Sequence, residues 1–167
     1  MDLWEAIKTR RSVRAYKSDA LSRELVEKVL EAARLAPSAA NRQPWHFFVV
    51  TDAGKRAALK AAYGKDWFAE APVVIVACAR PGTAWKRSDG VNYSMVDVAI
   101  AFDHLTLAAR AEGLGTCWIG AFKPAELRQV MGLPADLDPV AMTPLGVPAE
   151  EGRLPERKAL GEIVTWM

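Results

Sequence analysis

The sequence predicts a single α+β domain that spans residues 1–167. Two observations support this fold class. Segments with apolar residues at helical spacing alternate with short runs rich in β-branched residues, and no repeat, low-complexity tract or linker divides them. The chain has 167 residues, of which 51% are hydrophobic and 25% charged, and this composition suits one globular domain and excludes a disordered or fibrous chain.

The first part of the chain predicts two helices separated by an extended segment. Residues 3–9 place their apolar side chains on one helical face, and residues 10–16 then become β-like. Ser22 suits the N-cap of a second helix over residues 23–36. Pro37 ends that helix, because proline lacks the amide hydrogen that a continuing helix requires.

A strand, a helix and a second strand are predicted next. Residues 45–50 form the first strand, and residues 55–63 form a helix with Gly64 placed at its end. Residues 73–78 are an uninterrupted apolar run rich in β-branched residues. Such a run is typical of a central strand that is covered on both faces.

The longest predicted helix follows a loop over residues 80–93. This helix covers residues 94–112 and is apolar almost all round, so it is expected to be buried by its neighbours. Gly113 ends the helix, and residues 116–119 form a third strand.

The last part of the chain predicts a short helix, a fourth strand and a basic tail. Pro124 and Gly132 bracket the helix, since proline suits the first turn and glycine the exit. The strand covers residues 140–147 and is expected to be interrupted by Pro144. The tail spans residues 152–167.

Composition and charge narrow the class of protein. The formal net charge is +2, which calls for neither a nucleic acid nor a membrane as a partner. Cys78 and Cys117 form no C-x-x-C motif, and two histidines cannot make a histidine-rich metal site, so no metal is predicted. The acidic N-terminus and the lack of a long apolar run predict a soluble cytoplasmic protein.

The motifs of several enzyme classes are missing. The chain holds no P-loop and no G-x-S-x-G nucleophile elbow. Gly113 and Gly115 begin a dinucleotide fingerprint, but Trp118 stands where its third glycine would be, and the pair follows a helix. Because the side chains alone offer no obvious chemistry, a bound cofactor is the natural hypothesis.

The first candidate group lies in the predicted extended segment. Side chains alternate along extended backbone, so Arg10, Ser12 and Arg14 project to one side. Two guanidiniums that flank a hydroxyl suit a phosphate or another anionic oxygen. The alternative is a basic helix end that is solvated and favoured by the helix dipole.

Two further groups occur in the middle of the chain. The stretch from Pro37 to Pro44 offers the short polar side chains of Ser38, Asn41 and Gln43, although an ordinary helix-to-strand loop would have the same composition. The stretch around Gly120 offers bare backbone amides to a planar ligand. Helix capping by the preceding glycines and a buried tryptophan form the alternative for that stretch.

Taken together and in this order, these segments resemble the nitroreductase family of FMN-dependent oxidoreductases. The resemblance spans nearly the whole chain and rests on three stretches, Arg10-Arg11-Ser12-Val13-Arg14, Ala36-Pro37-Ser38-Ala39-Ala40-Asn41-Arg42-Gln43-Pro44-Trp45 and Gly113-Leu114-Gly115-Thr116-Cys117-Trp118-Ile119-Gly120, and on a basic residue in the tail.

The resemblance implies a three-layer α+β fold with a central, mainly antiparallel sheet flanked by helices. It also implies a homodimer with FMN at the subunit interface, where Pro37, Ser38 and Asn41 reach the flavin from the partner subunit. The residues matched to FMN-binding positions are Arg10, Arg11, Ser12, Arg14, Pro37, Ser38, Asn41, Gln43, Trp118, Ile119, Gly120, Ala121, Arg157 and Lys158.

The activity implied by the resemblance is a ping-pong oxidation of NAD(P)H. Two electrons would pass through flavin N5 to a small-molecule acceptor such as a nitroaromatic or a quinone, and no catalytic side chain is assigned. The alternatives are an FMN storage or sensor protein and a specialised member of the family, such as a dehalogenase, an azoline oxidase or a flavin-fragmenting enzyme. An anion- or nucleic-acid-binding module would use the same arginines, but the weak net charge argues against it.

Overall fold

The predicted central strand is the middle of a four-stranded antiparallel sheet. The computed structural model describes residues 1–167, and in it every residue of β2 (Val73–Ala79) is buried. β2 pairs with β1 (Trp45–Val50) on one side and with β4 (Asp138–Gly146) on the other. The short β3 (Gly115–Thr116) completes the order β1-β2-β4-β3. The prediction of a strand covered on both faces is therefore confirmed.

The prediction that Pro144 interrupts the fourth strand is wrong. β4 runs through this residue, and Pro144 stands opposite Val74 of β2. On its other side, β3 pairs only with Leu145 and Gly146, so no strand lies beside Pro144 there. A proline is tolerated because the amide hydrogen that it lacks has no ladder partner at that position.

The third strand is shorter than predicted. β3 ends at Thr116, and the chain then leaves the ladder until Ile119, which forms an isolated bridge with Met142. Cys117 N–H donates instead to Thr143 Oγ1 at 3.0 Å. The missing ladder contact is thus replaced by a side-chain hydrogen bond.

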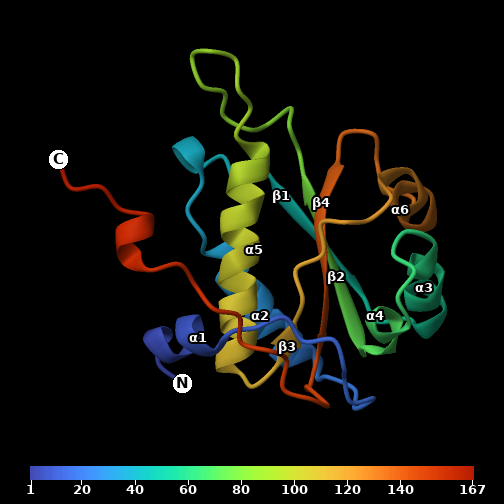
Figure 1. The fold of residues 1–167 in the computed structure, drawn as a ribbon. Coiled ribbons are helices and arrows are strands. Elements are labelled where there is room, and N and C mark those ends of the chain that lie inside the picture. The colour runs from blue at the N-terminus through green and yellow to red at the C-terminus, as the bar shows by residue number, and fades with distance from the viewer.

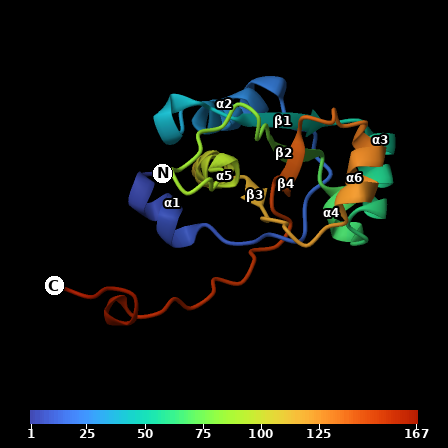
Figure 2. The ribbon, with the colours of Figure 1, turned by 90° about the horizontal axis from the view of Figure 1, so that it is seen from above.

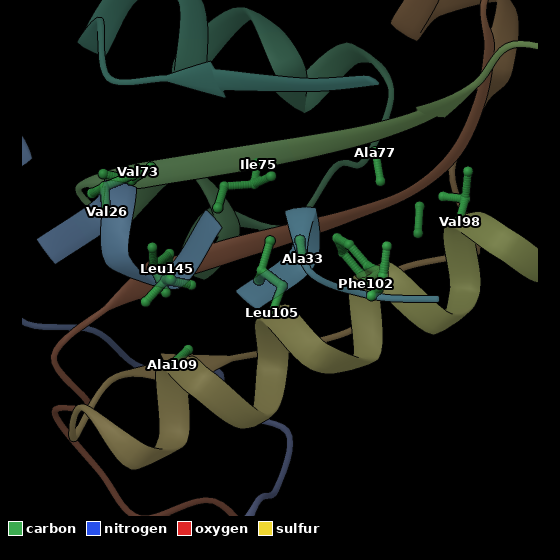
Figure 3. Packing of buried hydrophobic residues seen from close by; sticks show 14 of the residues in the cluster. Val26, Ala33, Val73, Ile75, Ala77, Val98, Phe102, Leu105, Ala109 and Leu145 are labelled. Carbon is green, nitrogen blue, oxygen red and sulfur yellow. The ribbon is translucent and has the colours of Figure 1, made fainter. Parts of the chain in front are cut away.

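Two long helices cover one face of the sheet, as Figures 1 and 2 show. α2 (Arg23–Arg34) and α5 (Ser94–Ala111) pack against each other, and α5 packs against β2 and β4. Side chains of α2 join the same apolar cluster, and α1 (Leu3–Thr9) lies against α5. Figure 3 shows the apolar side chains that fill this layer, among them Phe102 and Leu105 of α5. Both are fully buried, and each such side chain contributes about 1.5–3 kcal/mol to folding.

Shorter helices cover the opposite face. They are α3 (Ala53–Ala58), α4 (Asp66–Glu70) and α6 (Pro124–Met131), and a second apolar cluster joins them to the sheet. The structure therefore has three layers, with helices on both faces of the sheet (Figure 2). The expected three-layer α+β fold is confirmed.

Helix boundaries follow the capping residues. The predicted N-cap Ser22 is confirmed, since its Oγ accepts from Leu25 N–H at 3.2 Å. The helix predicted over residues 55–63 begins earlier, because the Asp52 carboxylate caps α3, and it continues only as the 3-10 turn Leu59–Ala61. No helix is both long and apolar enough to cross a membrane.

The longest helix is not buried all round. α5 turns eight residues into the core, but Met95 and Val96 in its first turn are 58% and 47% exposed. The predicted burial is therefore correct for one face and wrong for the other.

Candidate functional site

The extended segment between α1 and α2 lies beside β3 and carries the first group of predicted residues. Val13 N–H donates to Thr116 O at 2.9 Å, and Ser12 forms a parallel bridge with Thr116. Gly115 permits this approach, because a Cβ at that position would lie 2.9 Å from Val13 Cβ. Val13 is buried, and the alternation of side chains turns its neighbours outward.

The chain that follows β4 also contacts the extended segment between α1 and α2. Ala149 N–H donates to Ala15 O at 2.9 Å, so the chain beyond β4 runs back along this segment. Gly152 then lies directly on Ser12, where a Cβ would come within 2.2 Å of the Ser12 carbonyl oxygen. Only glycine allows the two backbones to lie this close.

A cleft of about 500 Å³ opens between these two stretches. We call it the basic cleft, with an N-terminal wall of Arg10, Ser12 and Arg14, a tail wall of Arg153, Pro155 and Arg157, and Arg11 between them. The prediction that Arg10, Ser12 and Arg14 project to one side is confirmed, because all three line the cleft, and Arg157 lines it with them. Lys158 does not line the cleft. Arg153 was not predicted as a site residue. A second arginine in the basic tail, four residues before Arg157, was the sequence signal that could have indicated it.

Most of the positive charge in the basic cleft is uncompensated. Arg11 forms an ion pair with Glu151, in which Nη1 lies 2.8 Å from Oε2. The other four guanidiniums of the cleft take part in no ion pair and donate no hydrogen bond to the protein. No carboxylate lines the cleft. Guanidiniums in this arrangement favour a multivalent oxyanion such as a phosphate.

Two titratable groups near the cleft, Cys117 and Tyr16, stay protonated and neutral at physiological pH. Burial raises the pKa of the Cys117 thiol, although the Arg14 guanidinium, the Ser12 hydroxyl and the Arg10 guanidinium act in the opposite direction. Burial also raises the pKa of Tyr16 far above its usual value. The Tyr16 hydroxyl donates to Val13 O at 2.7 Å. Cys117 is thus a buried thiol in an apolar environment rather than a nucleophile.

The third predicted group follows Thr116, the residue that is bridged to Ser12 of the N-terminal wall. Trp118 follows Cys117 directly, is 39% exposed, and meets the ring of Phe102 edge-on with 4.6 Å between centroids. Ile119 is buried, whereas Gly120 and Ala121 are exposed. A Cβ at Gly120 would meet no atom within 4 Å, so the backbone there is open to a ligand.

The second predicted group forms a strained loop at the far end of α5. Asn41 and Gln43 have φ values of 52° and 48°, a region that residues other than glycine seldom adopt. The Ser38 hydroxyl accepts from Gln43 N–H at 2.9 Å, and Asp97 Oδ1 accepts from Ala39 N–H at 2.9 Å. The buried carboxylate of Asp97 therefore holds the loop to the first turn of α5.

One chain does not bring the loop and the basic cleft together. Asp97 holds the loop at one end of α5, whereas Arg110, near the other end, donates from Nε to Thr9 Oγ1 at 2.9 Å, just before the N-terminal wall. Thirteen residues of α-helix separate the two anchors by roughly 20 Å. Figure 1 shows the loop beside the first turn of α5 and the segment after α1 near its last turn.

Comparison with known proteins gives a consistent result. A family model described as the nitroreductase family matches residues 7–65 and 56–147. The NADH dehydrogenase of Thermus thermophilus is 34% identical over 197 aligned positions, which cover 99% of this chain and 96% of that protein.

Solved structures share the fold. A nitroreductase family protein from Clostridium difficile 630 is 30% identical, superposes with a TM-score of 0.89, and is matched over 99% of this chain and 98% of its own. A structure from Exiguobacterium sibiricum 255-15, solved in complex with FMN, has a TM-score of 0.91 at 23% identity, with 100% of this chain and 98% of that one covered.

Proposed function

The chain belongs to the nitroreductase family, and from this premise we propose that it is an FMN-dependent oxidoreductase that takes two electrons from NAD(P)H. The observation that carries the proposal is the basic cleft, which holds unpaired guanidiniums and whose residue Ser12 is bridged to Thr116, four residues before the exposed backbone at Gly120. An elongated ligand would suit both features if it carried a phosphate for the guanidiniums at one end and a planar ring for the exposed backbone at the other.

The N-terminal wall fits the phosphate end of FMN. We assign Arg10, Ser12 and Arg14 to it, because two guanidiniums and a hydroxyl supply several donors for phosphate oxygens. Arg157 faces them across the cleft, and Lys158 follows it in the exposed tail. A phosphate monoester carries a charge of about −2 at neutral pH, and four uncompensated guanidiniums are sufficient to hold it.

The stretch Trp118, Ile119, Gly120 and Ala121 is assigned to the ring end. FMN, when bound, supplies the hydride chemistry that no side chain of this protein offers. The protein contributes open backbone at Gly120 and an aromatic edge at Trp118. The cationic cleft beside them favours negative charge on a nearby ligand. Burial keeps Cys117 and Tyr16 protonated, which argues against either as a base, and we assign no catalytic role to a side chain.

We further propose that the protein is a homodimer and that each flavin lies between two chains. Because Pro37, Ser38, Asn41 and Gln43 lie far from the basic cleft of their own chain, they can serve it only from a partner. α1, α2 and α5 enclose a largely apolar groove of about 480 Å³. The exposed large apolar side chains of this part of the molecule and of the tail are Met1, Leu3, Trp4, Ile7, Leu35, Met95, Val96, Leu154, Leu160, Ile163, Val164, Trp166 and Met167. Apolar surface of this extent favours association.

The electron acceptor in this proposal is a small molecule such as a nitroaromatic or a quinone, which would follow NAD(P)H at the same open face. A ping-pong order is expected because Gly120 and Ala121 leave one exposed backbone surface next to the cleft. Donor and acceptor would therefore use it in turn.

Absorbance spectroscopy of the purified protein tests the proposal. We expect flavin bands, a dimer in sedimentation, and bleaching of the flavin by NADH or NADPH in stopped flow, followed by reoxidation on addition of a quinone. A protein that stays colourless after incubation with FMN would contradict the cofactor assignment. Bound FMN that neither nucleotide reduces would indicate a storage or sensor protein instead.

A further inference from the structure

We propose that Arg11, together with Glu151 and Gly152, clasps the tail wall of the basic cleft against the N-terminal wall. Arg11 is then a positioning residue, and its guanidinium acts on the bound anion through the placement of the tail. The inference rests on the proposed function, in which the cleft holds the phosphate of FMN.

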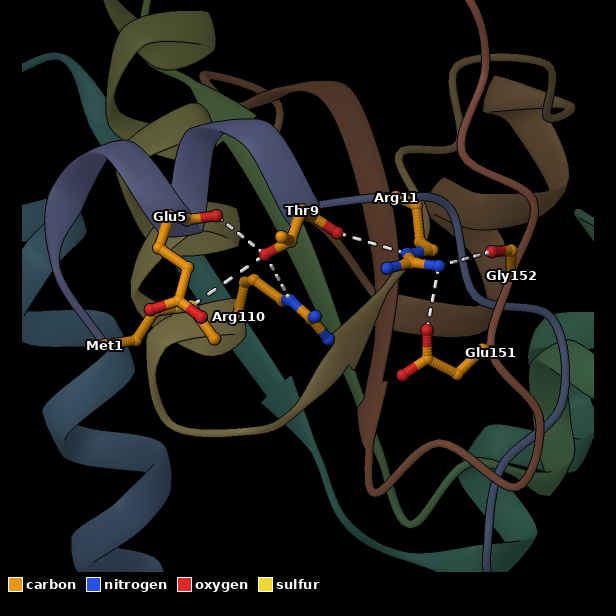
Figure 4. Close-up of polar contacts among 7 residues, drawn as sticks. All are labelled: Met1, Glu5, Thr9, Arg11, Arg110, Glu151 and Gly152. Atoms are coloured by element: carbon orange, nitrogen blue, oxygen red, sulfur yellow. Dashed lines mark hydrogen bonds and ion pairs between the residues drawn. The ribbon is translucent and has the colours of Figure 1, made fainter.

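The donors of Arg11 are directed to protein oxygens, unlike those of the other arginines in the cleft. Figure 4 shows its guanidinium between the end of α1 and the tail. Nε donates to Thr9 O at 3.1 Å, Nη1 donates to Gly152 O at 3.2 Å, and Nη1 lies 2.8 Å from Glu151 Oε2. The Arg11 side chain is only 18% exposed, so its guanidinium is partly sheltered from solvent.

The clasp is fixed to the body of the protein on the side of α1. The Thr9 hydroxyl donates to Glu5 O at 2.7 Å within α1 and accepts from Arg110 Nε at 2.9 Å (Figure 4). Because Arg110 belongs to α5, the carbonyl that Arg11 holds at Thr9 is tied to the longest helix of the core. The tail is thus attached to a rigid support.

On the side of the tail, the contacts of Arg11 are the last polar contacts with the rest of the chain. Ala149 N–H makes the final backbone hydrogen bond to the body, and beyond Gly152 every residue to Met167 is exposed. The later hydrogen bonds of the tail, around the 3-10 turn Leu160–Glu162, are local. Without the clasp, nothing polar would hold Arg153 and Arg157 across the cleft.

Removal of the Glu151 carboxylate distinguishes the clasp from a purely electrostatic effect, because the two predict opposite changes in phosphate affinity. The Glu151 carboxylate lies beside an anion site, so its removal should strengthen phosphate binding by Coulomb attraction alone. If Glu151 instead holds the tail wall in place, its removal weakens binding. Since Glu151 is 71% exposed, the effect of this one contact is expected to be about two- to fivefold.

The test compares FMN with riboflavin, which has the same ring and no phosphate. The chain of 167 residues is titrated with each flavin, and binding is followed by the quenching of flavin fluorescence. The variants are Glu151→Gln, Arg11→Lys, which keeps the charge but loses the fork geometry, and Gly152→Ala, which keeps every charge but pushes the tail from Ser12. Glu150→Gln is the matched control, because this neighbouring carboxylate makes no ion pair.

We expect all three clasp variants to lower FMN affinity, by about two- to fivefold for Glu151→Gln and about tenfold for the other two. Riboflavin affinity should not change, and Glu150→Gln should bind FMN as tightly as the wild type or more tightly. Tighter FMN binding by Glu151→Gln, or an equal loss of FMN and riboflavin in the clasp variants, would overturn the clasp alone. A wild-type chain that bound neither flavin would overturn the proposed function as well.

Discussion

The arginines of the basic cleft differ in what their donors already bind. Arg11 is committed to protein oxygens, whereas Arg10 and Arg14 form no ion pair and make no hydrogen bond within the chain. A free guanidinium contributes to ligand binding without first breaking a protein contact. At the scale of single residues, Arg10 and Arg14 are therefore the best candidates for direct contact with the phosphate.

Replacement of Arg10 by alanine should lower FMN affinity by about tenfold or more, because a hydrogen bond to a charged group contributes about 1.5–3 kcal/mol. Arg10 is half-buried in the wall of the cleft and supports no other residue, so the fold should be unaffected. Fluorescence titration measures the affinity. Arg23→Ala on the surface of α2 is the control, and an Arg10→Ala protein that keeps its full yellow colour through dialysis would contradict the assignment.

The buried thiol of Cys78 predicts a loss of stability in alkaline solution. Burial raises the pKa of Cys78 to about 11, whereas an unfolded cysteine titrates near 8.5. The folded state therefore holds the proton more tightly. This stabilisation is complete below the unfolded pKa, and it is lost as the pH rises through the folded value. Between pH 8.5 and pH 11 the loss is on the order of 2 kcal/mol.

Thermal unfolding across this pH range measures the effect. The Cys78→Ala variant should be less stable at neutral pH, and its melting temperature should fall less steeply between pH 8.5 and 11. A variant with the same pH slope as the wild type would show that other buried groups, such as Tyr16, account for the whole dependence.

At the scale of secondary-structure elements, α5 positions two groups that lie far apart in the sequence. Its first turn holds the loop of the second group through Asp97, and its last turn holds the end of α1 through Arg110. Each left-handed residue in the loop, such as Asn41, costs of order 1–3 kcal/mol, so the loop needs external support. The buried carboxylate of Asp97 provides it.

Replacement of Asp97 by alanine should release this loop and weaken FMN binding by about tenfold, since a buried hydrogen bond of about 1–1.5 kcal/mol is lost. Asp97→Asn should bind FMN normally, because its amide oxygen still accepts from Ala39 N–H. Asp103→Ala on the exposed face of the same helix is the control. Equal affinities for the alanine and asparagine variants in a fluorescence titration would show that Asp97 does not position the loop.

At the scale of the whole molecule, one chain separates groups that the proposed site needs together. The basic cleft and the loop lie near opposite ends of α5. Exposed large apolar side chains occur on α1, in the first turn of α5 and on the tail. A second copy that covers this surface would bury the apolar groups and supply the missing loop. Dimer formation would then both bury the apolar surface and complete the flavin site.

Mixed dimers of Arg10→Ala and Ser38→Ala chains test this arrangement. If the two residues serve one flavin from different chains, each mixed dimer has one site with both substitutions and one intact site. We expect about half of the flavin to bind with wild-type affinity, whereas each parent homodimer lacks such a site. Ser38→Ala alone should be the milder change, since the hydroxyl accepts one hydrogen bond of about 1 kcal/mol within its loop. Mixed dimers without a wild-type site would place both residues at the same flavin from one chain.

Elements encoded by contiguous residues were predictable. Ser22 marks the start of α2 because a hydroxyl can cap the helix locally, and the apolar run of β2 predicts burial on both faces. The motif that holds Arg10, Ser12 and Arg14 was recognised for the same reason, since alternation along extended backbone depends only on neighbouring residues. Boundaries were less accurate where a side chain outside the apolar pattern, such as Asp52, sets the first turn.

Contacts between distant parts of the chain determine the rest. Arg153 lines the cleft because Gly152 lies directly on Ser12. Arg11 holds the tail there by a hydrogen bond to the Gly152 carbonyl, 141 positions away in the sequence. Pro144 remains within β4 only because β3 ends beside it. Local patterns specify helices, strands and the charge of a segment, since these depend on neighbours in the chain. Which backbone lies on which, and hence which guanidiniums remain free for a ligand, follows only from packing in three dimensions.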